Sequence, residues 1–295
     1  MAASDDAGLP YDAGLPYDAG SPYDAGSPYP PELARFTVPG GGLRVPYGAE
    51  ADQYGELWLP ETGRPPHPVV VLVHGGYWRS RYRADLMHAL AHAVAHAGVA
   101  AWNLEYRRVG DPGGGLPGTF TDVAAGLEAL AGLAAAHSLD LARVAVVGHS
   151  AGGHLAAWLP ARTRTPWGVG GRIRLRLVVG LAPVADLRLA HAWKLSDDAA
   201  AGLIGGTAEE VPELYQLASP ADLLPLGVPQ VLVHGTADDA VPYEMSVRYQ
   251  RAARAAGDDC ELIRLPGGDH FTVIDPGSPA WAVTWERLSR ALDLG

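Results

Sequence analysis

The sequence contains very little of several things that common protein classes require. Cys260 is the only cysteine, which excludes an internal disulfide framework and thiolate zinc clusters. Lys194 is the only lysine and follows Trp193, so the chain has no Gly-Lys-Ser/Thr of a nucleotide-binding P-loop. The apolar stretch 86–102 carries three histidines and is shorter than a membrane span, so we expect no membrane helix there.

Positive charge is also scarce. The chain has 22 Lys and Arg against 33 Asp and Glu, a formal net charge of −11. Without a basic block it cannot hold a phosphate backbone by counterion release, so the expected partner is a small-molecule substrate, with no nucleic acid and no membrane. A homodimer is compatible with the composition. No basic side chain precedes Arg35 and no apolar segment follows the first residues, which predicts a cytoplasmic protein without a signal peptide.

The first residues form a tandem hexapeptide repeat. DAGLPY occurs twice and DAGSPY twice between Asp6 and Tyr29. Pro and Gly in every repeat oppose helix formation and leave little to bury, which predicts a disordered tail over residues 1–37. The remaining residues, 38–295, are expected to form one domain, since 48% of the chain is hydrophobic and can build a sizeable core.

The domain alternates short apolar runs with longer helical patterns. Continuous apolar strands separated by helices indicate an α/β fold with a mostly parallel, doubly wound sheet covered on both faces. Two earlier stretches, 43–45 and 55–59, are predicted to be antiparallel edge strands, which brings the sheet to about eight strands. The buried strands are predicted at residues 69–73, 98–104, 144–147, 175–181, 230–233 and 260–265.

Two further segments lead to specific expectations. The helical pattern over 82–97 places His88, His92 and His96 almost opposite its apolar face, and with no convergent further ligand this row is interpreted as a solvated face rather than a metal site. Residues 186–228 separate two strands by more than a typical crossover. Because insertions in doubly wound sheets often cover the carboxyl edge, this segment is interpreted as a small lid.

A motif for nucleophilic chemistry follows the run VAVV. Gly148, His149, Ser150, Ala151 and Gly152 give Gly-x-Ser-x-Gly between a predicted strand and a predicted helix. This is the nucleophile elbow, in which small neighbours allow a serine to occupy a strained backbone conformation. The helix that begins there adds a favourable field for a developing anion.

A serine hydroxyl needs a base that is oriented by a carboxylate. Asp238 follows the strand predicted at 230–233 and is the candidate acid, with its neighbour Asp239 left open as the alternative. His270 follows the strand predicted at 260–265 and is the candidate base. The chain order of nucleophile, acid and histidine is the order expected for this elbow, so a Ser150–His270–Asp238 triad is predicted.

The segment His74-Gly75-Gly76-Tyr77-Trp78 follows the first buried strand. Glycines let the backbone approach a substrate, and its amides together with the one after the nucleophile can stabilise an oxyanion. We expect the amides of Gly76, Tyr77 and Ala151 to form this oxyanion hole. His74 is interpreted as an organiser of the loop.

These segments together resemble the α/β-hydrolase superfamily. HGGYW, GHSAGGHLA, HGTADDAVP and GGDHF are most similar to the group of kynurenine formamidases (arylformamidases) and hormone-sensitive-lipase-like esterases. The resemblance covers residues from about 38 to the C-terminus. HGGxW and the Phe271 that follows His270 favour the formamidase branch. The resemblance implies an α/β-hydrolase fold and a serine hydrolase that needs no metal and no organic cofactor.

Three functions follow as hypotheses. The first is an arylformamidase that releases formate from N-formylkynurenine, with the aromatic ring stacked on Tyr77, Trp78 or Phe271, although Trp78 is equally compatible with a place in the core. The second is a short-chain carboxylesterase that uses the same machinery. The third is a non-catalytic ligand-binding protein on a hydrolase scaffold, which the presence of all three triad candidates disfavours.

Overall fold

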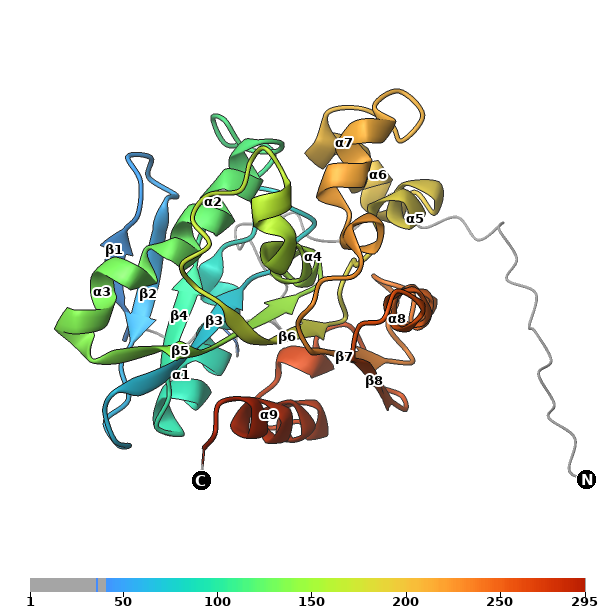
Figure 1. Cartoon of the computed structure of the whole chain (residues 1–295). Coiled ribbons are helices and arrows are strands. Elements are labelled where there is room, and N and C mark those ends of the chain that lie inside the picture. The colour runs from blue at the N-terminus through green and yellow to red at the C-terminus, as the bar shows by residue number, and fades with distance from the viewer. Residues whose placement is uncertain (1–35, 37–40, 295) are drawn as a thin grey trace, which may run out of the picture.

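The computed structural model describes residue 36 and residues 41–294, which form one eight-stranded sheet with helices on both faces (Figure 1). The strand order is β1-β2-β4-β3-β5-β6-β7-β8. β1 and β2 are antiparallel to their neighbours, and β3 to β8 are parallel, so the predicted fold is confirmed. The strands are β1 (Leu43–Pro46), β2 (Tyr54–Trp58), β3 (His67–Val73), β4 (Ala100–Leu104), β5 (Leu139–His149), β6 (Leu175–Leu181), β7 (Gln230–Gly235) and β8 (Cys260–Leu265).

The pleat of the central strands divides the core into two layers. Val69 and Val71 of β3 pack into one apolar cluster, and Val70 and Leu72 pack into the other, because successive side chains of a strand point to opposite faces. Helices α2, α3 and α4 cover the first layer, and α1 and α9 cover the second (Figure 1). The α-helices outside the lid are α1 (His88–His96), α2 (Gly118–Glu128), α3 (Leu130–His137), α4 (Ala151–Trp158), α8 (Glu244–Ala255) and α9 (Pro279–Ala291), and the 3-10 helices are η2 (Ala84–Met87), η3 (Leu159–Arg164), η4 (Pro220–Leu223) and η5 (Thr272–Ile274).

The observed elements agree with the sequence prediction most closely where strands are buried. β6 and β8 have the predicted bounds, whereas β5 begins five residues before the predicted start at 144. The early start follows from Ser138, whose left-handed backbone (φ 52°) ends α3 and lets Leu139 pair with His67. The charged residues Asp140 and Arg143 interrupt the apolar run at the start of β5 and hid this extension.

The histidine row only partly fits the predicted solvated face. His92 and His96 are exposed, and their rings stack 6.3 Å apart. His88 is mostly buried instead, because its Nε2 lies 2.7 Å from the Glu56 carboxylate and its ring packs on Trp58. The prediction was therefore wrong for His88, whose partner comes from β2 and could not be seen in the helical pattern.

One helical stretch in the described part of the chain, Gly118–His137, is long and apolar enough to cross a membrane by length and composition alone. It is divided into α2 and α3. Phe120, Val123 and Leu127 of α2 are fully buried against the sheet. The apolar character of α2 is thus explained by its place in the core, whereas Leu130 is the one fully buried residue of α3.

The segment predicted as a lid contains α5 (Leu187–Ala192), α6 (Leu195–Ile204) and α7 (Pro212–Ala218), which lie together at one end of the molecule (Figure 1). It is fastened to loops that follow β3 and β4, because Arg79 donates to the Ser196 carbonyl and the Leu116 amide donates to the Leu203 carbonyl. The segment therefore contacts loops at the carboxyl edge of the parallel strands, and its role as a lid stays a prediction. The predicted tail, 1–37, lies outside the described residues except for Phe36.

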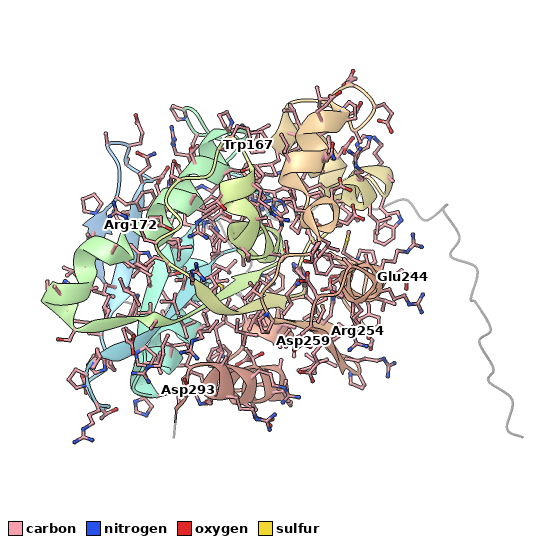
Figure 2. The ribbon with its side chains drawn as sticks, viewed as in Figure 1. Trp167, Arg172, Glu244, Arg254, Asp259 and Asp293 are labelled. Carbon is pink, nitrogen blue, oxygen red and sulfur yellow. The ribbon has the colours of Figure 1, made fainter. Side chains whose placement is uncertain are left out.

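Charged side chains lie mainly on the outside of this fold. Arg254, Asp259 and Asp293 are exposed around α8, β8 and the end of α9 (Figure 2). The Arg287 guanidinium pairs with Glu261 at 2.8 Å and so links α9 to β8. Such surface pairs contribute little to stability, so the buried polar groups described next are the informative ones.

Candidate active site

Four loops that follow parallel strands bring the candidate residues to one edge of the sheet. Tyr77 follows β3, Ser150 follows β5, Asp238 follows β7 and His270 follows β8. Carboxyl ends of parallel strands share one edge, where ligands bind in open α/β sheets. The topology therefore gathers residues that lie far apart in the sequence.

Ser150 lies at the sharp turn between β5 and α4. Its backbone has φ 54° and ψ −118°, a strained conformation for a residue with a side chain. The turn is held by the Ser150 amide, which donates to the Leu181 carbonyl, and by the Val184 amide, which donates to the Ser150 carbonyl. The side chain is almost fully buried, with 1% of the residue exposed.

The glycines on either side of the turn are required by close packing. A Cβ atom on Gly152 would lie 2.1 Å from the Val73 carbonyl oxygen, and one on Gly148 would lie 2.1 Å from the Gly152 carbonyl oxygen. A Cβ on Gly75 would approach the Ser150 Cβ to 3.0 Å. The loop after β3 is thus packed directly against the elbow.

Asp238 and His270 form a buried hydrogen-bonded pair. The Oδ2 atom of Asp238 lies 2.7 Å from His270 Nδ1. Its Oδ1 atom accepts hydrogen bonds from the amides of Ala240 and Val241. Asp239, in contrast, is exposed. Of the two carboxylates that the sequence left open, Asp238 is the one that contacts the histidine.

The carboxyl group of Asp238 has a strongly perturbed pKa. Burial alone would raise this pKa, but the charge of His270 and hydrogen bonds from His234 and His270 outweigh it and hold the pKa well below its ordinary value. His234 contributes its Nε2 atom 3.2 Å from Asp238 Oδ2. The carboxylate is therefore ionised over the whole neutral range.

Ser150 and His270 are not joined by a hydrogen bond within the described residues, and His149 is the side chain that links their two segments. His149, the neighbour of Ser150, has its ring 4.7 Å from the His270 ring, and its Nε2 lies 2.9 Å from the His270 carbonyl oxygen. Hydrogen bonds between a nucleophile and its base are often long or misaligned before substrate binds.

The loop after β3 adopts consecutive left-handed conformations. Gly76, Tyr77 and Trp78 have φ values of 106°, 48° and 57°. Within residues 41–294, neither the Gly76 amide nor the Ala151 amide donates to a protein acceptor. Ala151 begins α4, where the first amides of a helix have no intrahelical partner. Two of the three predicted oxyanion-hole amides are thus available to a ligand.

A buried polar cluster supports this loop from below. His74 places Nε2 2.9 Å from Glu105 and Nδ1 2.8 Å from the Gly75 carbonyl oxygen. Glu105 also pairs with Arg108, at 3.0 Å, and these three side chains are completely buried. The pKa of Glu105 is lowered, because His74 and Arg108 outweigh the effect of burial. His74 thus has the position expected of a loop organiser.

The aromatic residues predicted to contact substrate have different surroundings. Trp78 is 1% exposed, and its Nε1 donates a hydrogen bond to His154 Nδ1 at 3.2 Å. Of the two places left open for it, the structure therefore shows the core, and Trp78 offers no surface to a ligand. The Tyr77 hydroxyl donates to the Ala240 carbonyl at 2.5 Å and so ties its loop to the Asp238 loop. Phe271 is partly buried and its ring lies 5.3 Å from the His270 ring.

Sequence reasoning missed two contributors to the site. Glu105, directly after β4, is not among the predicted site residues, because its contact with His74 joins residues 31 positions apart. The hydrogen bond from His149 to the His270 main chain joins residues 121 positions apart, and no local pattern predicts it. In the part of the chain that the structure describes, no group of three or more His, Cys, Asp or Glu side chains could hold a metal ion.

The sheet and the elbow define an α/β-hydrolase of the esterase and formamidase group. A model of the BD-FAE family matches residues 56–252, more than half of the chain, so this chain belongs to that family. The match includes the elbow and Asp238 but ends before His270.

Curated relatives are distant. Kynurenine formamidase of Salmo salar is 25% identical over 240 residues, which cover 79% of this chain and 76% of that protein. Esterase LipC of Mycobacterium tuberculosis is 26% identical over 79% of this chain and 60% of LipC. Isoprenylcysteine alpha-carbonyl methylesterase ICME of Arabidopsis thaliana is 26% identical over 77% of this chain. The chain spans only 55% of ICME, so these proteins' activities are not transferred directly.

Solved structures confirm the fold. Esterase B from Lactobacillus rhamnosis superposes with a TM-score of 0.70 at 26% identity, covering 84% of this chain and 83% of that one. A truncated carbohydrate esterase from gut microbiota has a TM-score of 0.73 over 85% of this chain and 95% of its own, at 21% identity. The latter likeness supports the fold alone.

The packing of the elbow predicts a sharp contrast between two glycines. Gly152→Ala forces a Cβ into the Val73 carbonyl and is expected to lower the free energy of unfolding by about 3 kcal/mol or more. Gly132→Ala, in α3 with open space around it, is expected to raise it by about 0.5–1 kcal/mol. Urea unfolding of both variants measures the difference. Equal stabilities would contradict the packing described here.

The depressed pKa of Asp238 predicts acid sensitivity. A group whose pKa is lower in the folded than in the unfolded protein stabilises the fold above its unfolded value, about 3.9 for Asp, and loses that contribution as the pH falls towards the folded value. At pH 7, Asp238→Asn is expected to cost about 3 kcal/mol, and the gap to the wild type should narrow below about pH 4. The matched variant Asp239→Asn should stay within about 0.5 kcal/mol at every pH. Denaturant unfolding at pH 7, 5 and 3 tests this, and a gap for Asp238→Asn that is independent of pH would refute it.

Proposed function

We propose that this protein is a serine hydrolase that cleaves esters or amides of small acyl groups. The observation that carries the proposal is the buried Asp238–His270 pair beside the strained elbow of Ser150. Membership of the BD-FAE family and the similarity to esterases and formamidases support it.

In this mechanism, Ser150 Oγ attacks the substrate carbonyl and His270 Nε2 takes the hydroxyl proton. Asp238 accepts the hydrogen bond from His270 Nδ1, which keeps the imidazole in the useful tautomer and stabilises the imidazolium. His270 then protonates the departing alkoxide or amine, and water hydrolyses the acyl-enzyme by the reverse proton path. Neither step requires a metal or an organic cofactor.

The oxyanion of the tetrahedral intermediate would be held by amides of Gly76, Tyr77 and Ala151. Each such donor lowers the barrier by about 3–4 kcal/mol when it is correctly aimed. The left-handed run from Gly76 to Trp78 turns successive amides of one loop towards the same side. The start of α4 adds the amide of Ala151 and the favourable end of the helix dipole.

Two substrate classes fit this chemistry. The closeness of Gly75 to Ser150 and the low exposure of Ser150 favour a small acyl group such as formyl or acetyl. The formamidase relative, matched over 76% of its length, favours N-formylkynurenine. Trp78 is buried and the Tyr77 hydroxyl is tied to Ala240, which leaves less aromatic surface for a substrate ring than the sequence predicts and favours a simple short-chain ester.

The role of Ser150 is tested by labelling and substitution. We expect a fluorophosphonate to add one adduct at Ser150, seen by intact mass and peptide mapping. Ser150→Ala should abolish the adduct and lower kcat for p-nitrophenyl acetate by about 10⁴-fold or more. Ser289, which lies on α9, provides the matched control as Ser289→Ala and should keep full activity. An active Ser150→Ala protein would exclude the proposed nucleophile.

The acyl and leaving groups are tested by assaying p-nitrophenyl acetate, p-nitrophenyl butyrate and N-formylkynurenine side by side. If the acyl site is small, kcat/KM should fall at least about tenfold from the acetyl to the butyryl ester. This corresponds to a loss of roughly 1.4 kcal/mol in transition-state binding, because the longer acyl chain fits poorly. Turnover of N-formylkynurenine above that of the acetyl ester assigns the arylformamidase. Ester hydrolysis without any formamide hydrolysis assigns the carboxylesterase, and labelling of Ser150 without turnover of any member of the panel would count against both.

A further inference from the structure

His149 lies between the nucleophile elbow and the loop that carries His270. It is the last residue of β5, directly before Ser150, and only 1% of it is exposed. Its Nε2 atom is 2.9 Å from the main-chain carbonyl oxygen of His270, and its ring packs 5.7 Å from Phe271. One side chain thus joins the two segments that must meet for catalysis.

The partners of the ring fix its tautomer. A carbonyl oxygen only accepts hydrogen bonds, so the hydrogen is on Nε2. Burial, and secondarily the charge of His270, lower the pKa of His149 to about 3, so the ring stays neutral. The Nδ1 atom is then an acceptor, and it is buried without a partner in the described chain, next to the backbone of Gly75.

A packing role alone does not account for this arrangement. An apolar side chain of the same length would fill the space without leaving a buried nitrogen unpaired, and such unpaired groups call for an explanation. The hydrogen bond from His149 Nε2 to the His270 carbonyl oxygen explains why a histidine is present here. Asp238 restrains the His270 ring from one side, but that contact alone leaves the main chain of His270 free to shift.

We propose that His149 is a positioning residue whose Nε2–H holds the His270 main chain in register with Ser150. The proposal rests on the proposed serine hydrolase function. Because His149 and Ser150 are adjacent, any movement of the elbow carries His270 with it, and the separation of nucleophile and base is preserved. Small misplacements of reacting groups lower rates strongly, by about 100-fold for 1 Å, so this coupling affects turnover rather than affinity.

Three variants distinguish the effect of the hydrogen-bond donor of His149 from the effect of the volume of its ring. His149→Gln places an amide N–H near the position of Nε2, His149→Met has similar length without a donor, and His149→Asn is polar but too short to reach His270. For p-nitrophenyl acetate, the Met and Asn variants should lose about 10- to 100-fold in kcat with KM within about threefold. The Gln variant should stay within about fivefold of the wild type. His88→Met, in α1 and outside the contacts of the site described above, is the matched control and should keep its kcat.

A spectroscopic measurement makes the result independent of activity. The proton between His270 Nδ1 and Asp238 should give a downfield NMR resonance in the wild type and in His149→Gln, and this resonance should broaden or disappear in the Met and Asn variants. A wild-type kcat in His149→Met would overturn the proposal. So would a His149→Gln protein of unchanged melting temperature that restores neither the kcat nor the downfield resonance. An inactive wild type that still shows the resonance and its loss on substitution would refute the hydrolase function but not the positioning by His149.

Discussion

The close approach of the elbow after β5 to the end of β3 is the constraint on which the rest of the site depends. Gly152 has no room for a side chain against the Val73 and His74 carbonyls, and Gly75 has hardly any against Ser150. Ser150 has its strained backbone at this contact, where the end of β3 packs directly against the turn after β5. The strain is compensated by the surrounding hydrogen bonds of the turn and by the buried core on both sides of β5.

The same contact explains why the supporting polar groups are buried. The left-handed residues from Gly76 to Trp78 lie outside the sheet, where the Arg79 amide donates to the Gly76 carbonyl and the Val109 amide to the Trp78 carbonyl. Below them, His74 contacts the Gly75 carbonyl and Glu105, and Tyr106 adds a hydrogen bond to the His74 carbonyl. The buried charges of Glu105 and Arg108 are tolerated because they neutralise each other.

The sequence predicts the fold well, and it selects candidate residues that the fold brings to one edge of the sheet, for physical reasons. Strands buried on both faces are continuous apolar runs, and strand β6 can be delimited from that signal alone. The elbow and the segment around His270 are local motifs with fixed spacing to a strand. What the sequence cannot supply is the partner across space: His88 meets Glu56 of another strand, and Trp78 turns into the core to reach His154. Asp238 and Asp239 differ only in the direction of their side chains, which a linear pattern does not encode.

The buried histidines show how partner chemistry assigns roles to one residue type. His74 and His270 each face a carboxylate, and in the proposed mechanism Asp238 stabilises the His270 ring when it takes the serine proton. His149 and His154 donate only to main-chain carbonyls, and burial lowers their pKa values to about 3 and about 4. Rings of the second kind keep the same charge across the working pH range and serve as fixed hydrogen-bond donors. The site therefore combines a histidine that faces a carboxylate with neighbours that stay neutral. In the proposed mechanism, this separation would let a proton move at His270 without disturbing the scaffold that holds it.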